Sequence, residues 1–332
     1  MTKPKIAFIG TGGTIASLGR GPLDLQDYGA AGNVMHAEEI LAKWPVAGQI
    51  ADVIAINYRN IPSTAIDFAD WKALAALCAS LPVRHKDLAG IVIGHGTATL
   101  EETAYFLNLT VKTPIPVVLV GAQRPSSALS SDAGMNLVNA IRVAACPEAR
   151  GLGVLVVLND EIHAAREVTK TATLRLQTFR TPDFGVLGHA DGDAVVFYRQ
   201  PVRRRAPDTE FDISGLDTIP RVDIAYSHAG ADGTAIRAFV AAGARGIVSA
   251  GFAPGFSTPG EAAALKEAIA KGVVAVQSTR AGSGRTFQNT RLAEAGILIA
   301  DNLNPQKARI LLSLALTVTQ SPEDIMRIFR TY

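Results

Sequence analysis

Short runs of apolar residues alternate with longer stretches of helical periodicity along most of this chain. In the first 200 positions the apolar runs cover 6–9, 52–56, 90–94, 117–120 and 154–158. Apolar residues at helical spacing indicate helices at 66–81, from 100 to about 111, and within 121–145. Strands that are apolar at every position are buried on both faces, as in a parallel sheet covered by helices. The pattern therefore predicts an α/β fold built from βαβ units.

Residues 199–220 interrupt this alternation. They hold three prolines and the cluster Arg203-Arg204-Arg205, with little apolar periodicity. Beyond them the expected strands cover 222–226, 246–250 and 273–277, and the expected helices cover 232–242, 259–271, 305–317 and 322–330. A chain of 332 residues is long for one core, so two domains are expected. We predict a larger N-terminal domain at 1–200, a linker at 201–220 and a smaller C-terminal α/β domain at 221–332.

The composition excludes several classes of function. Apolar residues make up 48% of the chain and charged residues 19%, with a formal net charge of +2, which is typical of a soluble globular protein. We therefore expect no nucleic-acid partner and no membrane partner, and we interpret the arginine cluster as a solvated linker. Cys78 and Cys146 have no metal-binding spacing and are expected to be reduced, and no metal or cofactor is expected. No apolar run reaches transmembrane length and the first strand begins too early for a signal peptide, so a cytoplasmic location is expected if Met1 is the native start.

A glycine-rich turn follows the first expected strand. Gly10-Thr11-Gly12-Gly13 leads directly into Thr14 at the carboxyl end of that strand, the usual ligand crevice of an open α/β sheet. A Walker phosphate loop is excluded because no Gly-Lys-Ser/Thr follows, and a dinucleotide fingerprint lacks its third small residue, since Ile15 stands there. A structural turn and a loop that carries a nucleophilic threonine both fit the remaining pattern. This stretch alone does not decide between them.

Two further segments are expected beside the same crevice. Residues 18–33 contain several Gly and Asp residues and have no periodicity, so we predict a mobile lid that carries Tyr28. The expected strand at 90–94 opens into a polar turn ahead of the next helix. In that turn Thr99 and Glu102 have the spacing of a capping box, which predicts that the helix begins there.

Several motifs occur in one order along the chain. They are Gly12-Gly13-Thr14-Ile15-Ala16, His95-Gly96-Thr97-x-Thr99-x-Glu101-Glu102, Gly121-Ala122-Gln123-Arg124-Pro125-Ser126, Asn159-Asp160…Arg166-x-Val168-Thr169-Lys170-Thr171, Gly246-Ile247-Val248-Ser249-Ala250-Gly251 and Leu303-Asn304-Pro305-Gln306-Lys307-Ala308-Arg309. With these motifs the chain resembles, over essentially its whole length, the bacterial-type L-asparaginase/glutaminase family. The resemblance implies a threonine amidohydrolase that forms an acyl-enzyme. It also implies a homotetramer of intimate dimers, in which a loop of the neighbouring subunit completes each site.

The resemblance also implies roles for single residues. Thr14 matches the nucleophile and Tyr28 the lid tyrosine that supports proton transfer. Thr97 and Lys170 match two of the three members of a second proton-transfer group. Ser63, in Asn60-Ile61-Pro62-Ser63, matches the serine that holds the substrate's α-carboxylate, and Gly96 lies in the same expected subsite.

Each of these roles has a structural alternative. Tyr28 could pack in the lid, Thr97 could cap a helix, and Lys170 could be a solvated charge. His95 has no partner pattern and is interpreted as structural. The chemistry itself requires that a free hydroxyl lose its proton to a neighbouring base, and a lysine can be that base only if its pKa is lowered.

The chain departs from the family pattern where an amino-acid substrate's ammonium would bind. Ala98 stands at the position of an aspartate, Arg291 at that of a neighbouring subunit's glutamate, and Phe256 at that of an asparagine. Leaving a desolvated ammonium without its counter-charge costs about 2–5 kcal/mol. Glu294 could restore an acid near Arg291.

Three hypotheses about function follow. The first is an amidohydrolase of asparaginase type, acting on a small primary amide: L-asparagine handled poorly, or a carboxylate-bearing amide without an α-ammonium. The second is a binding or regulatory protein that kept the fold and lost turnover. The third is nucleotide-dependent catalysis at the glycine turn, which a cofactor bound to the purified protein would reveal.

Overall fold

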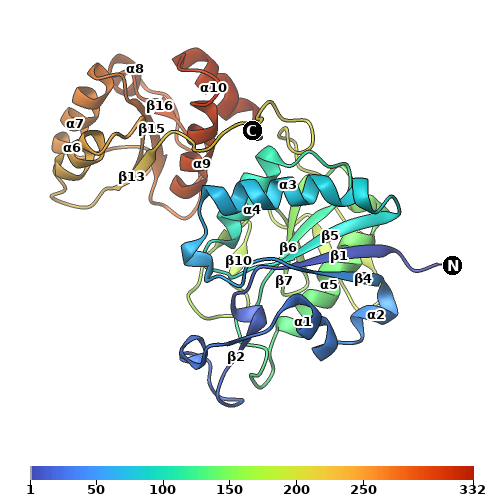
Figure 1. Cartoon of the computed structure of the whole chain (residues 1–332). Helices are drawn as coiled ribbons and strands as arrows, with labels where there is room; N and C mark the ends of the chain where they lie inside the picture. The colour runs from blue at the N-terminus through green and yellow to red at the C-terminus, as the bar shows by residue number, and fades with distance from the viewer. Residues whose placement is uncertain (1) are drawn as a thin grey trace. The chain divides into compact units, whose positions relative to one another are not determined.

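The computed structural model describes residues 2–332 and divides them into two compact α/β units (Figure 1). The division falls between Thr209 and Glu210, inside the proline-containing stretch 201–220. Each unit has its own sheet and its own hydrophobic core. The predicted α/β class with a larger and a smaller α/β unit is confirmed.

The first unit is built on an eight-stranded sheet in the order β12-β11-β8-β7-β6-β5-β1-β4. Its strands are β1 (Lys5–Gly10), β4 (Asp52–Asn57), β5 (Leu88–Gly94), β6 (Val117–Val120), β7 (Val154–Leu158), β8 (Glu161–Ala164), β11 (Gly188–Ala190) and β12 (Val195–Phe197). From β4 to β7 neighbouring strands run parallel, with Phe8 paired to Ala55 on one side and to Val92 on the other. All their carboxyl ends therefore reach the same edge of the sheet.

One end of this sheet is antiparallel, which the sequence pattern did not predict. Strands β8, β11 and β12 are antiparallel to their neighbours. The cause is the connection after β7, which consists of Asn159 and Asp160, both with positive φ (53° and 64°). Two residues with positive φ form a tight hairpin turn, whereas a parallel partner would need a crossover of a dozen residues or more.

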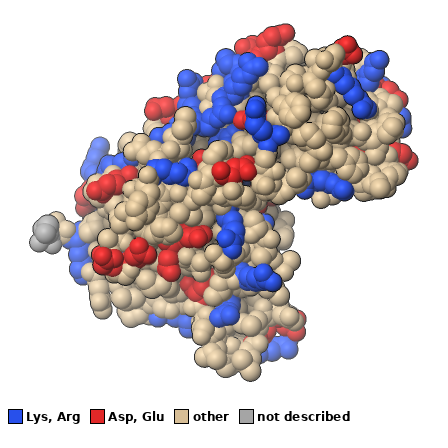
Figure 2. Space-filling view, turned by 180° about the vertical axis from the view of Figure 1, so that it is seen from behind, with Lys and Arg blue, Asp and Glu red and all other residues tan. Residues whose placement is uncertain are grey.

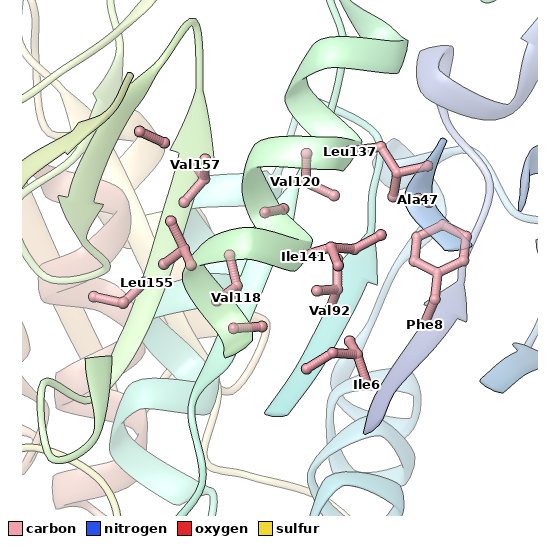
Figure 3. Close-up of a cluster of buried hydrophobic side chains, with 14 of the residues drawn as sticks. Ile6, Phe8, Ala47, Val92, Val118, Val120, Leu137, Ile141, Leu155 and Val157 are labelled. Carbon is pink, nitrogen blue, oxygen red and sulfur yellow. The ribbon is translucent and has the colours of Figure 1, made fainter. Parts of the chain in front are cut away.

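Helices cover both faces of this sheet. The helices α3 (Phe68–Arg84) and α4 (Leu100–Thr110) pack on one face, and α1 (Ala37–Lys43), α2 (Ala47–Ile50) and α5 (Ala133–Ala145) lie on the other (Figure 1). In Figure 3, Leu137 and Ile141 of α5 lie over Val92, Val118 and Phe8 of the sheet. Each fully buried side chain of this kind contributes about 1.5–3 kcal/mol. With both faces buried, the ends of the strands are the places where polar chemistry reaches solvent.

The segment predicted as a lid has more regular structure than its sequence suggests. After the 3₁₀ turn Thr14–Ala16, the short strand β2 (Ser17–Leu18) pairs with β3 (Asn33–Val34), and the 3₁₀ turn Tyr28–Ala31 lies between them. Two bonds fix the segment to the loop before α5: the amide of Gly19 donates to Ser127 Oγ (2.7 Å), and the amide of Leu129 donates to the carbonyl of Pro22 (2.8 Å).

The second unit is a smaller parallel sheet in the order β13-β14-β15-β16. Its elements are β13 (Val222–Tyr226), α6 (Thr234–Ala241), β14 (Gly246–Gly251), α7 (Pro259–Ala270), β15 (Val274–Thr279), α8 (Thr290–Glu294), β16 (Leu298–Ile299), α9 (Pro305–Ala315) and α10 (Pro322–Thr331). The helices α6 and α7 pack against each other over one core, while α9 packs on β13, β14 and β15. The predicted strands and helices of this half are confirmed, and α8 and β16 are additions.

Charged side chains of both signs are mixed over the face seen in Figure 2, as the formal net charge of +2 leads one to expect. Within residues 2–332 no helix has the length and the apolar character needed to cross a membrane.

Candidate functional site

Two glycine turns meet at the carboxyl ends of β1 and β5. Gly13 has φ +83°, and a Cβ atom placed on it would lie 2.3 Å from Gly96 Cα. A Cβ atom on Gly96 would lie 2.6 Å from Ser63 Oγ. Glycine is therefore required at Gly13, where the contact is with backbone and φ is positive, and a side chain at Gly96 would have to displace Ser63. This close packing brings the residues after Gly13, the residues after Gly96 and the 3₁₀ turn at Ser63–Ala65 together.

Hydrogen bonds hold the three loops in register. Thr11 Oγ1 donates to the carbonyl of Gly94, and Thr99 Oγ1 donates to the carbonyl of Ser63, both at 2.8 Å. Thr99 is the N-cap residue of α4, as predicted, but its side chain makes no capping bond there. The expected capping box with Glu102 is therefore wrong, and the Thr99 side chain is instead oriented towards a carbonyl of another loop. The helix-capping alternative for Thr97 is wrong as well, since Thr99 occupies that position.

The loops enclose a pocket of about 400 Å³. The structure brings seven of the predicted site residues to its wall: Thr14, Tyr28, Ser63, Gly96, Thr97, Ala98 and Lys170. The remaining lining residues are Gly12, Gly13, Ser17, Gly29, Val34, Asn60, Ile61, Pro62 and Thr64. Of these, Ser17, Val34 and Thr64 were missed by sequence reasoning, and the only available signal was their position beside residues already singled out.

The Thr14 hydroxyl lies against the lid tyrosine. Thr14 Oγ1 and Tyr28 Oη are 2.9 Å apart, and either atom can be the donor. Pairing of β2 with β3 folds the chain back, so that a residue fourteen positions after Thr14 returns to it. Both side chains are only partly buried and line the pocket. The distance suits direct proton transfer between the two oxygens.

Lys170 approaches the pocket from a separate hairpin. The strand β9 (Thr169–Lys170) pairs with β10 (Phe179–Arg180), and Gln123 Nε2 donates to the carbonyl of Arg175 in the loop between them (3.2 Å). Lys170 Nζ donates to Thr97 Oγ1 at 2.8 Å, so the side chain is bonded and half-buried rather than solvated. Burial lowers the pKa of Lys170 below its ordinary value, and the nearby charge of Glu101 opposes that shift in part.

The charge of the pocket is one-sided. Among the described residues that line it, Lys170 is the single charged side chain and none is acidic. Ala98, where the family pattern has an aspartate, is exposed at the pocket wall and offers only a methyl group. Within the first unit, the pocket therefore favours an anionic group over a cationic one.

His95 lies behind the pocket and is completely buried. Its Nδ1 donates to the carbonyl of Gly96 at 2.7 Å, which assigns the proton of the neutral ring to Nδ1. Burial lowers the pKa of His95 from 6.5 to about 4, so the ring is neutral at physiological pH. This environment agrees with the structural interpretation of His95.

The other predicted site residues belong to the second unit. Phe256 is 43% exposed and follows β14, where it forms a bridge with Phe252. Arg291 and Glu294 are exposed on α8. The substrate-binding roles of Phe256 and Arg291, and the compensating role of Glu294, stay predictions. Among residues 2–332, no group of His, Cys, Asp and Glu side chains is arranged to hold a metal ion.

Comparison with known proteins identifies the family. Residues 5–203 match the model of the asparaginase N-terminal domain, and residues 221–329 match that of the glutaminase/asparaginase C-terminal domain. L-asparaginase 2 of Bacillus subtilis is 43% identical over 99% of this chain and 87% of its own length. L-asparaginase 2 of Escherichia coli is 40% identical over 99% of this chain and 93% of its own. The crystal structure of a probable cytoplasmic L-asparaginase from Campylobacter jejuni superimposes on this chain with a TM-score of 0.94. The two sequences are 39% identical, and the match covers 100% of each chain. The chain belongs to the asparaginase family of amide hydrolases.

Proposed function

We propose that this protein hydrolyses a small primary amide to the acid and ammonia through an acyl-enzyme on Thr14. The observation that carries the proposal is the 2.9 Å contact between Thr14 Oγ1 and Tyr28 Oη at the wall of a pocket that also contains Thr97 and Lys170. A threonine hydroxyl is a weak nucleophile unless a neighbouring group takes its proton. Tyr28 lies within reach of that proton.

The reaction proceeds in two steps. Thr14 Oγ1 attacks the amide carbon while its proton passes to the Tyr28 oxygen, and Tyr28 gives its own proton to the leaving nitrogen, so that the C–N bond breaks and ammonia departs. Water next attacks the ester carbon, and its proton passes through the Thr97 hydroxyl to the neutral amine of Lys170. The ester C–O bond breaks, the acid leaves and Thr14 regains its hydrogen. The lowered pKa of Lys170 suits it to a step in which it must accept a proton.

The proposed substrate carries a carboxylate beside its amide. Ser63, buried at the pocket wall, is the proposed hydroxyl for that carboxylate, and the positive charge of Lys170 adds long-range attraction. An α-ammonium would find no acid in the part of the pocket that the first unit supplies. We therefore propose that an amide such as succinamate, without the ammonium, is handled better than L-asparagine.

Assembly and location are further parts of the proposal. A homotetramer in which a neighbouring subunit contributes Phe256 and Arg291 is proposed from the family resemblance. A cytoplasmic location is also proposed. The Campylobacter jejuni relative is named as probably cytoplasmic, whereas a Haemophilus influenzae relative that is 38% identical is named as probably periplasmic.

The test is ammonia release from L-asparagine, L-glutamine and succinamate, with Thr14→Ala as the matched variant. We expect measurable turnover on at least one amide, succinamate ahead of L-asparagine, and a loss of several powers of ten in the variant. Tight binding of these amides without turnover by the wild-type protein would favour the alternative of a binding or regulatory protein. Turnover by Thr14→Ala within tenfold of wild type would refute the assignment of the nucleophile.

A further inference from the structure

A buried carboxylate lies behind Lys170. Glu101 stands in the first turn of α4 and is only 6% exposed. Its Oε1 atom accepts two hydrogen bonds from β9, one from the Thr169 hydroxyl (3.2 Å) and one from the backbone amide of Lys170 (3.1 Å). Burial of a carboxylate is costly unless hydrogen bonds or positive charge compensate it. Both donors belong to β9, the segment that carries Lys170.

The two ends of Lys170 are held by one segment of the chain. Its backbone amide binds Glu101, and its Nζ atom binds Thr97 Oγ1 at 2.8 Å. Thr97 and Glu101 are four residues apart, whereas Lys170 lies 69 positions after Glu101. The position of the Lys170 amine relative to Thr97 therefore depends on the hydrogen bond by which Glu101 holds the β9–β10 hairpin in place.

Glu101 also faces Lys170 electrostatically. Its negative charge favours the ammonium form of Lys170 and opposes the effect of burial. Two other titratable groups must be considered around this amine. Tyr28 lines the same pocket from the lid, and Arg180 stands opposite Thr169 on β10 with its side chain exposed. The charge that acts on the pKa of Lys170 is that of Glu101, whereas Ala98 offers none.

We propose that Glu101 is a positioning residue of this site, which seats the Lys170 backbone beside Thr97 and supplies the negative charge that faces the Lys170 amine. The proposal rests on the proposed function only for the proton-transfer role of Lys170. The two parts of the role separate by mutation. Glu101→Gln keeps an oxygen that can accept both bonds and removes the charge, whereas Glu101→Ala removes both.

The control is Glu102→Gln, which removes an equal charge from the same turn of α4 and so matches the effect on the helix dipole. The first measurement is competitive labelling of Lys170 with an amine-reactive reagent across a pH series, followed by peptide mass spectrometry. It requires no turnover. We expect Glu101→Gln to lower the titration midpoint of Lys170 by about one pH unit, with a clearly smaller change in Glu102→Gln.

The second measurement is kcat and KM on the best amide, together with the pH profile. We expect Glu101→Ala to lower kcat on the order of ten- to a hundredfold with a smaller change in KM, because misplacement of a proton-transfer group acts mainly on the chemical step. Glu101→Gln should recover much of that loss and move the acid limb of the profile to lower pH. If Glu101→Ala fails to fold, Glu101→Gln and its labelling midpoint decide alone.

The proposal is overturned if the labelling midpoint of Lys170 is the same in wild type, Glu101→Gln and Glu102→Gln. It is also overturned if a folded Glu101→Ala variant keeps the wild-type kcat. A shifted midpoint without turnover by any variant, wild type included, would refute the proposed function and leave the positioning role of Glu101 standing.

Discussion

The close packing of Gly96 predicts what a single methyl group should do to the site. In Gly96→Ala the new Cβ atom would lie 2.6 Å from Ser63 Oγ, 2.8 Å from Ser63 Cβ and 3.3 Å from Gly13 Cα. Normal contacts between such atoms are about 3.5–4.0 Å, so the overlap with Ser63 is roughly 1 Å. The contact with Gly13 Cα is also shorter than an ordinary contact. Ser63, the proposed carboxylate-binding hydroxyl, must therefore move.

The cost follows from this overlap. Overpacking of a well-packed site costs about 1–3 kcal/mol, which corresponds to a fall of about 2–12 °C in melting temperature for a domain of this size. A displacement of this kind also lowers activity on the order of ten- to a hundredfold. The matched control is Gly48→Ala in α2, where a Cβ atom meets nothing within 4 Å. A helical Gly→Ala change in open space should leave activity unchanged and stabilise slightly.

The assay combines melting curves with kcat and KM on the best amide for both variants. We expect Gly96→Ala to melt lower than wild type and to show a raised KM, since the displaced hydroxyl is the one proposed to bind the substrate's carboxylate, with a fall in kcat where Thr97 moves too. Equal stability and equal activity of Gly96→Ala and Gly48→Ala would contradict this prediction. Such a result would mean that the loops meet without constraint at this point.

Three other outcomes are expected. Lys170→Met should lower kcat far more than it raises KM, and a change confined to KM, measured by steady-state kinetics, would make Lys170 a binding residue instead. Ala98→Asp should shift preference from succinamate towards L-asparagine by about one to three powers of ten in kcat/KM, less if Arg291 repels the ammonium, and an unchanged ratio would contradict the missing-acid argument. Because the pKa of His95 is lowered to about 4 in the fold, the unfolded chain takes up a proton below pH 6.5 that the folded chain refuses. Stability should therefore fall between pH 6.5 and pH 4, by about 3 kcal/mol that a folded His95→Gln variant does not lose in urea titrations.

The sequence predicted the parallel core of the fold because apolar runs such as those of β1 and β5 are buried on both faces and stand out from their surroundings. It did not predict the antiparallel end of the large sheet. The strands there are short. The hairpin turn depends on positive φ at Asn159 and Asp160, and the pattern of apolar residues does not indicate such a turn. Short elements such as β9 contain too few residues to show a periodic pattern, so the sequence does not predict them.

The site was predicted in part for a similar reason. The family motifs indicated Thr14 and Lys170, but the contact of Glu101 with Lys170 joins residues 69 positions apart and has no local pattern. Thr99 gave a local pattern that failed, because the carbonyl of Ser63 is a tertiary acceptor that only the fold brings near. Packing between loops therefore determines the partners of Glu101 and Thr99, which the spacing of residues along the chain does not reveal.

An acyl-enzyme on Thr14 can be detected by trapping the covalent intermediate. Wild-type protein is quenched in acid during turnover of the best amide, digested, and its peptides are analysed by mass spectrometry. We expect to find the substrate's acyl group on Thr14 in the peptide that contains it, and to find none on Thr14→Ala treated identically. Two results would contradict an acyl-enzyme on Thr14. One is turnover with the acyl group on Thr97 instead. The other is turnover with no acyl group on any peptide and with no hydroxamate product when hydroxylamine is added as a second nucleophile.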